Sequence, residues 1–211
     1  MTQVTLHKQG LDKQPLCLRK PIEYPQLTGS DHWKRKMRTI FRAFDVDGDG
    51  CLTEDDMEAV VRRTAEYMNL DDENTNILLN QRLTYLRDVS SKDSTGEIKG
   101  KLSEDEFVQN HLANINESKF RNIWFDMLSS RFQMMDTDGD GLVSSDEYAA
   151  LFYSFNIPSE HSDKIFDIID TDNDGFISKD DFVQALTEFW LSENPDNKYN
   201  ECFGPLVDVT N

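Results

Sequence analysis

The sequence predicts an all-α fold in which four helix–loop–helix units form two pairs and pack as one compact globule. Three observations support this prediction. An acidic loop of twelve residues occurs in three complete copies, apolar residues recur at helical spacing around each copy, and a degraded fourth copy completes the second pair. The 211 residues, of which 37% are hydrophobic, are enough for a substantial core. Extended disorder is therefore not expected.

The three complete loops begin at Asp45, Asp136 and Asp170 and share one pattern. Each has aspartate at positions 1, 3 and 5, glycine at position 6, an aliphatic residue at position 8 and a carboxylate at position 12. This is the pattern of the EF-hand calcium loop. So many carboxylates within twelve residues repel one another unless a hard cation binds them through oxygen. We therefore expect Ca²⁺ at three sites.

The loop positions also predict the individual ligands. Positions 1, 3, 5 and 12 supply carboxylate oxygens, and position 7 supplies a backbone carbonyl. Because Ca²⁺ prefers oxygen to sulfur, the cysteine at position 7 is expected to act through its carbonyl and not its thiol. The predicted ligands are Asp45, Asp47, Asp49, Cys51 and Asp56 in the first loop, Asp136, Asp138, Asp140, Leu142 and Glu147 in the third, and Asp170, Asp172, Asp174, Phe176 and Asp181 in the fourth.

Position 12 distinguishes the three sites. Glu147 is long enough to bind an ion with both oxygens, whereas Asp56 and Asp181 are one methylene shorter. A lower coordination number favours the smaller Mg²⁺, which prefers octahedral geometry. We expect the third site to be the most selective for Ca²⁺, and Mg²⁺ to compete at the first and fourth loops.

Apolar residues at intervals of three or four predict the helices that enter and leave these loops. The first entering helix begins after Ser30, which can cap it. Around the first loop, the apolar residues are Ile40, Phe41, Phe44, Met57, Val60 and Val61. Around the third, they are Phe120, Ile123, Trp124, Met127, Leu128, Phe132, Met135, Tyr148, Leu151 and Phe152. Around the fourth, they are Ile165, Phe166, Ile169, Phe182, Leu186, Phe189 and Trp190.

The second unit is less obvious. A helix over Leu78–Val89 is followed by a stretch that aligns as a loop if Thr95 is its first residue. Lys99 then stands at position 5, where its ammonium would repel a cation. The alternative is a linker unrelated to the motif, but Leu102 and Phe107 keep the expected apolar positions. We interpret this loop as a structural partner that has lost its metal.

The loop starts also predict how the units pair. The first unit lies next to the second, and the third next to the fourth. The residues at position 8 can then form a short antiparallel β-bridge within each pair. These residues are Leu52, Leu102, Val143 and Ile177.

We divide the chain into four parts. Residues 1–30 form an N-terminal arm, 31–112 the first two units, 113–192 the third and fourth, and 193–211 a C-terminal tail that folds back on the core. The arm is polar and contains three prolines, which favours a flexible or loosely docked segment. Its mildly basic charge leaves open a transit peptide or an arm that folds onto the acidic body.

Composition limits the partners. A formal net charge of −18 disfavours nucleic acid and anionic membranes, and no apolar run is long enough to insert in a bilayer. Cys17, Cys51 and Cys202 are too widely spaced for a disulfide framework. Without a secretory signal pattern, these features predict a cytoplasmic protein. We expect a monomer, and no catalytic motif indicates an enzyme.

Four units with a degraded second loop, followed by the tail FWLSENPDNKYNECFGPLVD at residues 189–208, resemble a known family. Over residues 31–208 the chain is similar to the sarcoplasmic calcium-binding proteins of invertebrates, including calexcitin-like members, and to the related coelenterazine-binding proteins and photoproteins. The resemblance implies two pairs of EF-hands packed face to face. It also implies a calcium buffer that binds Ca²⁺ and Mg²⁺.

Two other functions remain open. A calexcitin-like sensor would engage an unknown protein target through a Met-rich groove, but no methionine stripe is evident. A coelenterazine-type carrier would hold a small ligand in an aromatic cavity, and the residues that suggest one are Trp33, Trp124, Trp190 and Tyr153. A plain aromatic core explains them more simply. For His111 and His161 we expect surface or capping roles.

Overall fold

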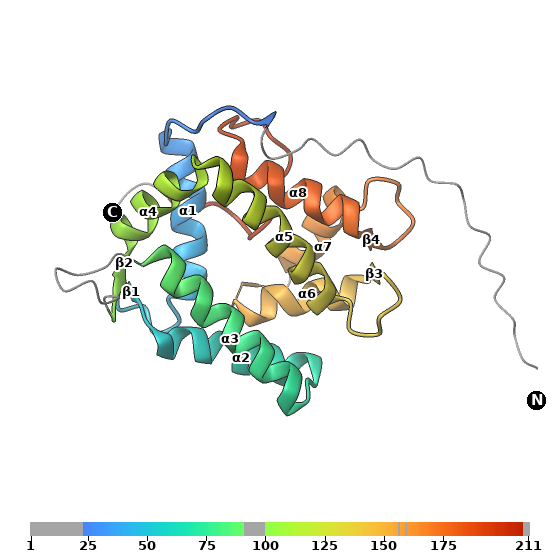
Figure 1. The fold of residues 1–211 in the computed structure, drawn as a ribbon. Coiled ribbons are helices and arrows are strands. Elements are labelled where there is room, and N and C mark those ends of the chain that lie inside the picture. The colour runs from blue at the N-terminus through green and yellow to red at the C-terminus, as the bar shows by residue number, and fades with distance from the viewer. Residues whose placement is uncertain (1–22, 91–99, 156, 159, 209–211) are drawn as a thin grey trace, which may run out of the picture.

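The computed structural model describes residues 23–208 except 91–99, 156 and 159. Short helices dominate these residues, and Figure 1 shows how they are arranged. The first half contains α1 (Asp31–Phe44), β1 (Cys51–Leu52), α2 (Glu54–Met68), α3 (Asp72–Val89), β2 (Leu102–Ser103) and α4 (Glu104–Ile115). The second half contains α5 (Ser118–Met135), β3 (Leu142–Val143), α6 (Ser145–Ser154), α7 (Glu160–Ile169), β4 (Ile177–Ser178) and α8 (Lys179–Leu191). Among the described helices, none combines the length and apolarity that crossing a membrane requires.

Short polar side chains determine where the helices begin. Ser30 caps α1 as expected, because its hydroxyl accepts a hydrogen bond from the Trp33 amide. The residue at loop position 9 caps each exiting helix in the same way. At Thr53, Ser103 and Ser144 the carboxylate at position 12 completes the capping box by accepting from the cap residue. Asp56 and Glu147, which were predicted as metal ligands, thus also fix the starts of their helices.

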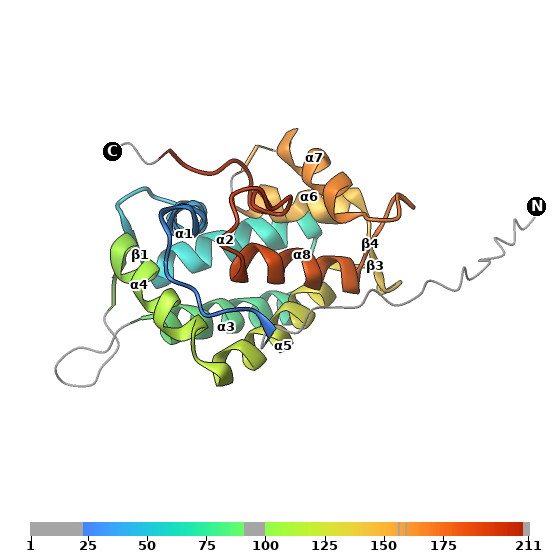
Figure 2. The ribbon, with the colours of Figure 1, turned by 90° about the horizontal axis from the view of Figure 1, so that it is seen from above.

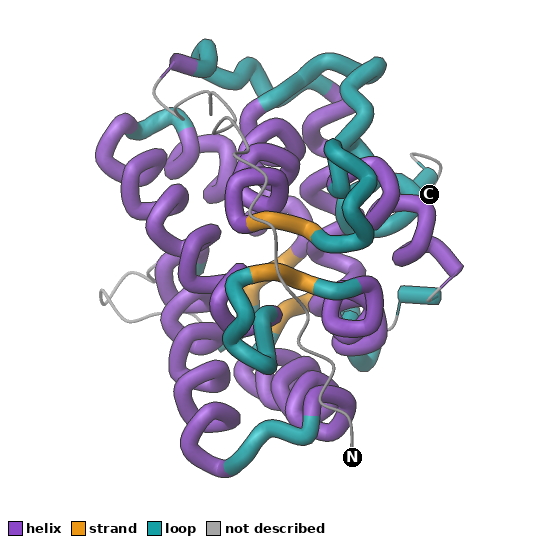
Figure 3. Tube along the Cα trace, turned by 90° about the vertical axis from the view of Figure 1, so that its right-hand side faces the viewer, coloured by secondary structure: helices purple, strands orange, loops and turns teal. Residues whose placement is uncertain are grey.

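The expected pairing of the loops is confirmed. β1 pairs antiparallel with β2, so that Leu52 lies opposite Leu102. β3 pairs with β4, so that Val143 lies opposite Ile177. Figure 3 shows the two short ribbons. All four of these position-8 side chains are buried, which holds each loop in register with its partner.

The two pairs pack on each other around one continuous apolar core. Helix α2 of the first pair contacts α6 of the second. The rings of Phe44 and Phe155, from opposite pairs, meet edge to face with their centroids 5.0 Å apart. Helix α4 ends at Ile115 and α5 begins at Ser118, so these helices do not form one long helix that separates two lobes. The predicted compact arrangement is therefore confirmed.

The interpretation of His111 as a surface or capping residue is wrong. This histidine is 1% exposed and lies in the core between the two pairs. Its Nε2 is 2.9 Å from the Tyr85 hydroxyl, its Nδ1 is 2.8 Å from the Phe107 carbonyl oxygen, and its ring stacks on Trp190. Burial lowers the pKa of His111 to about 4, so the ring is neutral at pH 7. A polar ring is tolerated here because both nitrogens have partners.

Residues 193–208 lie against α1, as Figure 2 shows. Arg35 donates from Nε to the Val207 carbonyl at 2.6 Å, and the Val207 amide donates to the Thr39 hydroxyl at 3.1 Å. Cys202 and Phe203 are buried in the core. The tail thereby adds apolar area to the contact between the two pairs.

The segment before α1 is held by one buried arginine. Arg121, in α5, donates to the carbonyls of Tyr24, Pro25 and Ile115 at 2.6 to 2.8 Å. Glu193 accepts hydrogen bonds from the amides of residues 28 and 30. Residues 23–30 therefore lie on the body of the protein, whereas residues 1–22 of the expected arm lie outside the described residues.

Some predictions concern residues that the structure does not describe. These are the second-loop assignments of Thr95 and Lys99, the thiol of Cys17 and the side chain of Trp124. Trp33 and Trp190 are buried, but Tyr153 is 48% exposed. Cys51 and Cys202 are free thiols.

Candidate metal centres

Each complete loop brings carboxylates together at its centre. In every case, three side chains each offer one oxygen, and these oxygens lie within 4.8 Å of one another. The three groups are Asp45, Asp47 and Asp56; Asp136, Asp138 and Glu147; and Asp170, Asp172 and Asp174. Clusters of like charge at this spacing suit a divalent cation bound through oxygen. Asp49, Asp140 and Asp181 lie outside these groups.

The loop backbone is folded by its own carboxylates. The position-1 aspartate accepts a hydrogen bond from the position-6 glycine amide in all three loops, at 2.9 to 3.1 Å. The position-5 aspartate accepts from the position-7 amide, at 2.8 to 3.0 Å. The turn requires positive φ at position 6, +84° at Gly141 and +86° at Gly175, which glycine adopts without strain. After this turn, the position-7 residues Cys51 and Leu142 enter the short strands.

The carboxylate at position 12 links the two ends of each loop. In the third loop, Glu147 accepts from the amide and hydroxyl of Thr137 at 2.8 and 2.7 Å through Oε1, and from those of Ser144 at 2.8 Å through Oε2. Burial opposes ionisation of Glu147, but these hydrogen bonds outweigh it and lower its pKa. Both oxygens are already positioned near the acidic group.

The shorter aspartates at position 12 behave differently from each other. Asp56 accepts from the Val46 amide at 3.0 Å and the Thr53 amide at 2.9 Å, and it belongs to the acidic group of its loop. Asp181 accepts from the hydroxyls of Thr171 at 2.6 Å and Ser178 at 2.5 Å, and it lies outside the group of the fourth loop. The first and fourth loops are therefore not equivalent.

Two oxygens at the loop centres fit a bound cation. Asp45 Oδ1 and Asp136 Oδ1 are buried and have no hydrogen-bond partner. Burial raises the pKa of Asp45, and the neighbouring charges of Asp56 and Asp47 raise it further. An unpartnered buried oxygen beside like charges is unfavourable unless a cation is bound. The residues at position 1 thus suit the ion that the loop pattern predicts.

The structure adds one residue that the sequence did not suggest. Lys101 stands at position 7 of the second loop, and its Nζ lies 3.2 Å from Asp49 Oδ2 in the first loop. The β1–β2 bridge causes this proximity, because it places the two loops side by side. The ammonium competes with a metal ion for the position-5 carboxylate. The alignment of two paired loops, considered together, could have indicated this contact.

Comparisons with known proteins agree with the loop geometry. A family model described as an EF-hand domain pair matches residues 34–153 and 125–187. A sarcoplasmic calcium-binding protein of Perinereis vancaurica tetradentata is 33% identical over 178 residues, which cover 84% of this chain and all of the relative.

Solved structures with a similar fold include okadaic acid binding protein 2.1, with a TM-score of 0.67 and 26% identity over 85% of this chain and 98% of the other. The calcium-loaded apo form of the coelenterazine-binding protein from Renilla muelleri has a TM-score of 0.63. It is 23% identical, over 84% of this chain and 99% of the other, so it supports the fold alone.

Proposed function

Because the chain belongs to the sarcoplasmic calcium-binding protein family of EF-hand proteins, we propose that it is a cytoplasmic calcium buffer with three functional sites. Calcium binding follows from the family, whereas the buffering role and the number of sites are inferences. The three acidic groups, one in each complete loop, support the number of sites. The second loop would act as a structural partner.

The observation that carries the buffering role is the closed contact between the two pairs. A sensor exposes an apolar groove when it binds Ca²⁺, whereas buffer EF-hands barely open. Here Phe44 and Phe155 join the pairs in one core, and residues 193–208 add Phe203 to it. Opening a groove would expose this apolar area to water, which opposes a sensor mechanism.

The proposed ligands are the oxygens of the fifteen residues that the loop pattern predicts. In the third site, the ion would take both oxygens of Glu147, which would release the Thr137 and Ser144 donors that now hold them. In the fourth site, Asp181 would have to turn away from Thr171 and Ser178. We infer that Mg²⁺ competes with Ca²⁺ at the first and fourth loops.

The preference for Mg²⁺ can be tested with two substitutions. Asp56→Glu and Asp181→Glu lengthen the carboxylate at position 12, so each should raise the Ca²⁺ affinity of its own site and reduce competition by millimolar Mg²⁺. The neighbouring residues provide matched controls: Asp55→Glu, at an exposed position, and Asp180→Glu, at a half-buried one. The measurement is calorimetric titration of Ca²⁺ with and without Mg²⁺. If neither position-12 variant differs from its control, the assignment of mixed sites is wrong.

The buffering role itself needs a separate test. Retention on a phenyl resin that depends on Ca²⁺ would indicate an exposed groove and favour a sensor. A buffer should bind Ca²⁺ without such retention. We expect no retention, a monomer in both states and no association with nucleic acid or membranes.

A small-ligand carrier is the second candidate function. One observation favours it: a cavity of about 530 Å³ lies beside the third loop. Two structural neighbours are named for the small molecules coelenterazine and okadaic acid. Carriage of a ligand and buffering of Ca²⁺ do not exclude each other.

A further inference from the structure

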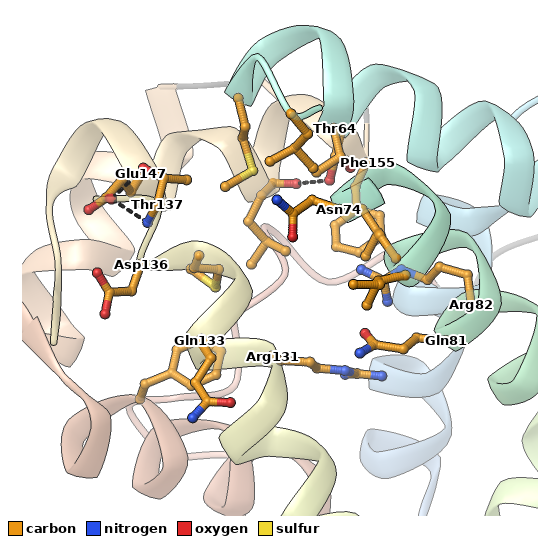
Figure 4. A pocket seen from close by; sticks show the side chains of 18 of the residues that line it. Thr64, Asn74, Gln81, Arg82, Arg131, Gln133, Asp136, Thr137, Glu147 and Phe155 are labelled. Atoms are coloured by element: carbon orange, nitrogen blue, oxygen red, sulfur yellow. Dashed lines mark hydrogen bonds between the residues drawn. The ribbon is translucent and has the colours of Figure 1, made fainter. Parts of the chain in front are cut away.

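The cavity of about 530 Å³ opens between the turn that joins α2 to α3 and the helices α5 and α6. A volume of this size suits a small organic molecule, and most such sites combine apolar walls with a few polar groups. Figure 4 shows Asp136, Thr137 and Glu147 at one end, and Gln81, Arg82 and Arg131 at the other. The apolar part of the wall includes Leu78, Leu151, Phe155, Phe182, Leu186 and Phe203.

Arg82 is the unusual group in this wall. It is only 8% exposed, and its guanidinium carbon lies 5.5 Å from the ring centroid of Phe44 and 5.6 Å from that of Phe155. The two rings stabilise the charge through cation–π contacts but accept no directional hydrogen bond. Nε is buried without a partner, and no residue in the described part of the chain accepts a hydrogen bond from this guanidinium or forms an ion pair with it. A buried arginine is seldom left without an acceptor.

A second positive charge lies at the same end of the cavity. The Arg131 guanidinium carbon lies 5.7 Å from the ring centroid of Tyr85, and Figure 4 shows its side chain directed toward Gln81 and Arg82. Burial and, to a smaller extent, the neighbouring charge of Arg131 together lower the pKa of Arg82 to about 9. Like charges therefore meet at a buried position in a protein whose net charge is −18. An anion at this end would relieve both the desolvation of Arg82 and the repulsion.

We propose that this cavity binds an organic carboxylate with an apolar body, and that Arg82 and Arg131 hold the carboxylate. The guanidinium presents donors in a planar fork that matches a carboxylate, and such charged hydrogen bonds are strong. The apolar body would lie along Leu78, Phe155 and Leu186. The acidic side chains Asp136 and Glu147 occupy the opposite end, so a single orientation is favoured.

This inference deepens the second candidate function, ligand carriage, and is independent of calcium buffering. Asp136 and Glu147 belong to both the third acidic group and the cavity wall. All ligand titrations are therefore made at saturating Ca²⁺, so that Asp136 and Glu147 are in the same metal-bound state in every measurement. A separate Ca²⁺ titration of each variant shows whether the metal sites are intact, so failure of one function can be told from failure of the other.

The test compares decanoate with 1-decanol, which has the same chain length but no charge, by calorimetry or by the change in tryptophan fluorescence. Loss of a charge-assisted hydrogen bond typically reduces affinity about ten- to a hundredfold, so decanoate should bind more tightly than decanol by that factor. Arg82→Met should bring the two affinities within about threefold of each other, because only the apolar contacts remain. Arg87→Met removes the same charge from an exposed position of the same helix and should leave the preference unchanged.

Three results would overturn the proposal. Equal affinity of the wild-type protein for decanoate and decanol would be the first, and this comparison needs no variant. Absence of decanoate binding at millimolar concentration would be equally decisive. An effect of Arg87→Met as large as that of Arg82→Met would show that the preference arises from general charge. If Arg82→Met fails to fold, Arg131→Met, at a partly exposed position, should still reduce decanoate affinity and leave decanol affinity unchanged.

Discussion

Removing one charge from the third acidic group should remove a defined share of the stability that Ca²⁺ provides. A ligand that binds only the folded state stabilises it by about 4 kcal/mol when its free concentration is a thousand times its dissociation constant. The structure contains three acidic groups, one in each complete loop. At that concentration, calcium should therefore raise the free energy of unfolding by about 12 kcal/mol. Glu147→Gln should reduce this increment by about 4 kcal/mol, because the third site loses its long carboxylate.

The assay is urea denaturation, with each protein measured in chelator and at buffered free Ca²⁺. Glu147 also completes the capping box of α6, so the variant should be less stable in chelator by about 1 kcal/mol. Subtracting the value in chelator removes this contribution. Asp146→Asn makes the same change in charge at the exposed adjacent residue and should keep the full increment. An undiminished increment in Glu147→Gln, or an equal loss in Asp146→Asn, would refute the reasoning.

Three further substitutions test contacts outside the acidic groups. Lys101→Met should raise the Ca²⁺ affinity of the first site about two- to fivefold by freeing Asp49, an effect that chelator competition can measure and that added salt should weaken. Burial lowers the pKa of Lys36 to about 8 from 10.5. Between pH 8 and pH 10.5 the unfolded chain therefore binds more protons than the folded one. Over this range the free energy of unfolding of the wild-type protein should rise with pH, by up to about 3 kcal/mol relative to Lys36→Met. If Lys36→Met showed the same rise in stability with pH as the wild-type protein, this assignment would be wrong. Lys34→Met is the control and should keep the wild-type profile. Arg121→Met should destabilise the protein by about 3 to 5 kcal/mol in urea denaturation, because three carbonyls lose a charged donor.

The fold was predictable because its determinants are local. Ser30 caps the first helix, apolar residues at helical spacing mark the buried faces, and Leu52 pairs with Leu102 as the loop positions require. The start of α3 was harder to predict from the sequence. The helix begins at Asp72, well before the apolar residues at Leu78, since the cap at Asp71 and not an apolar stripe determines its first turn.

Contacts between distant segments were not predictable in the same way. His111 was misplaced at the surface, because the sequence does not show that Tyr85 and Trp190 would surround its ring. The contact of Lys101 with Asp49 depends on the register of two paired loops. Arg82 has an ordinary position in a helix, and only the packing of the two pairs encloses it in a cavity.

The geometry of the acidic groups was predictable in part, whereas the metal ligands themselves stay predictions. The loop pattern correctly indicated that Asp136, Asp138 and Glu147 converge, because the glycine turn fixes the backbone between them. It did not indicate that Asp181 would lie outside its group, held by the hydroxyls of Thr171 and Ser178. Side chains at equivalent positions thus differ in their partners, and those partners are not part of the repeated pattern.

The number of calcium ions bound per chain tests the central claim most directly. Equilibrium dialysis of the purified protein against radioactive Ca²⁺, at free concentrations up to a millimolar, measures it without any substitution. Three intact loops and one silent loop predict saturation at three ions per chain. Saturation at four would contradict the interpretation of the second loop, and saturation at two or fewer would contradict the assignment of the three acidic groups as calcium sites.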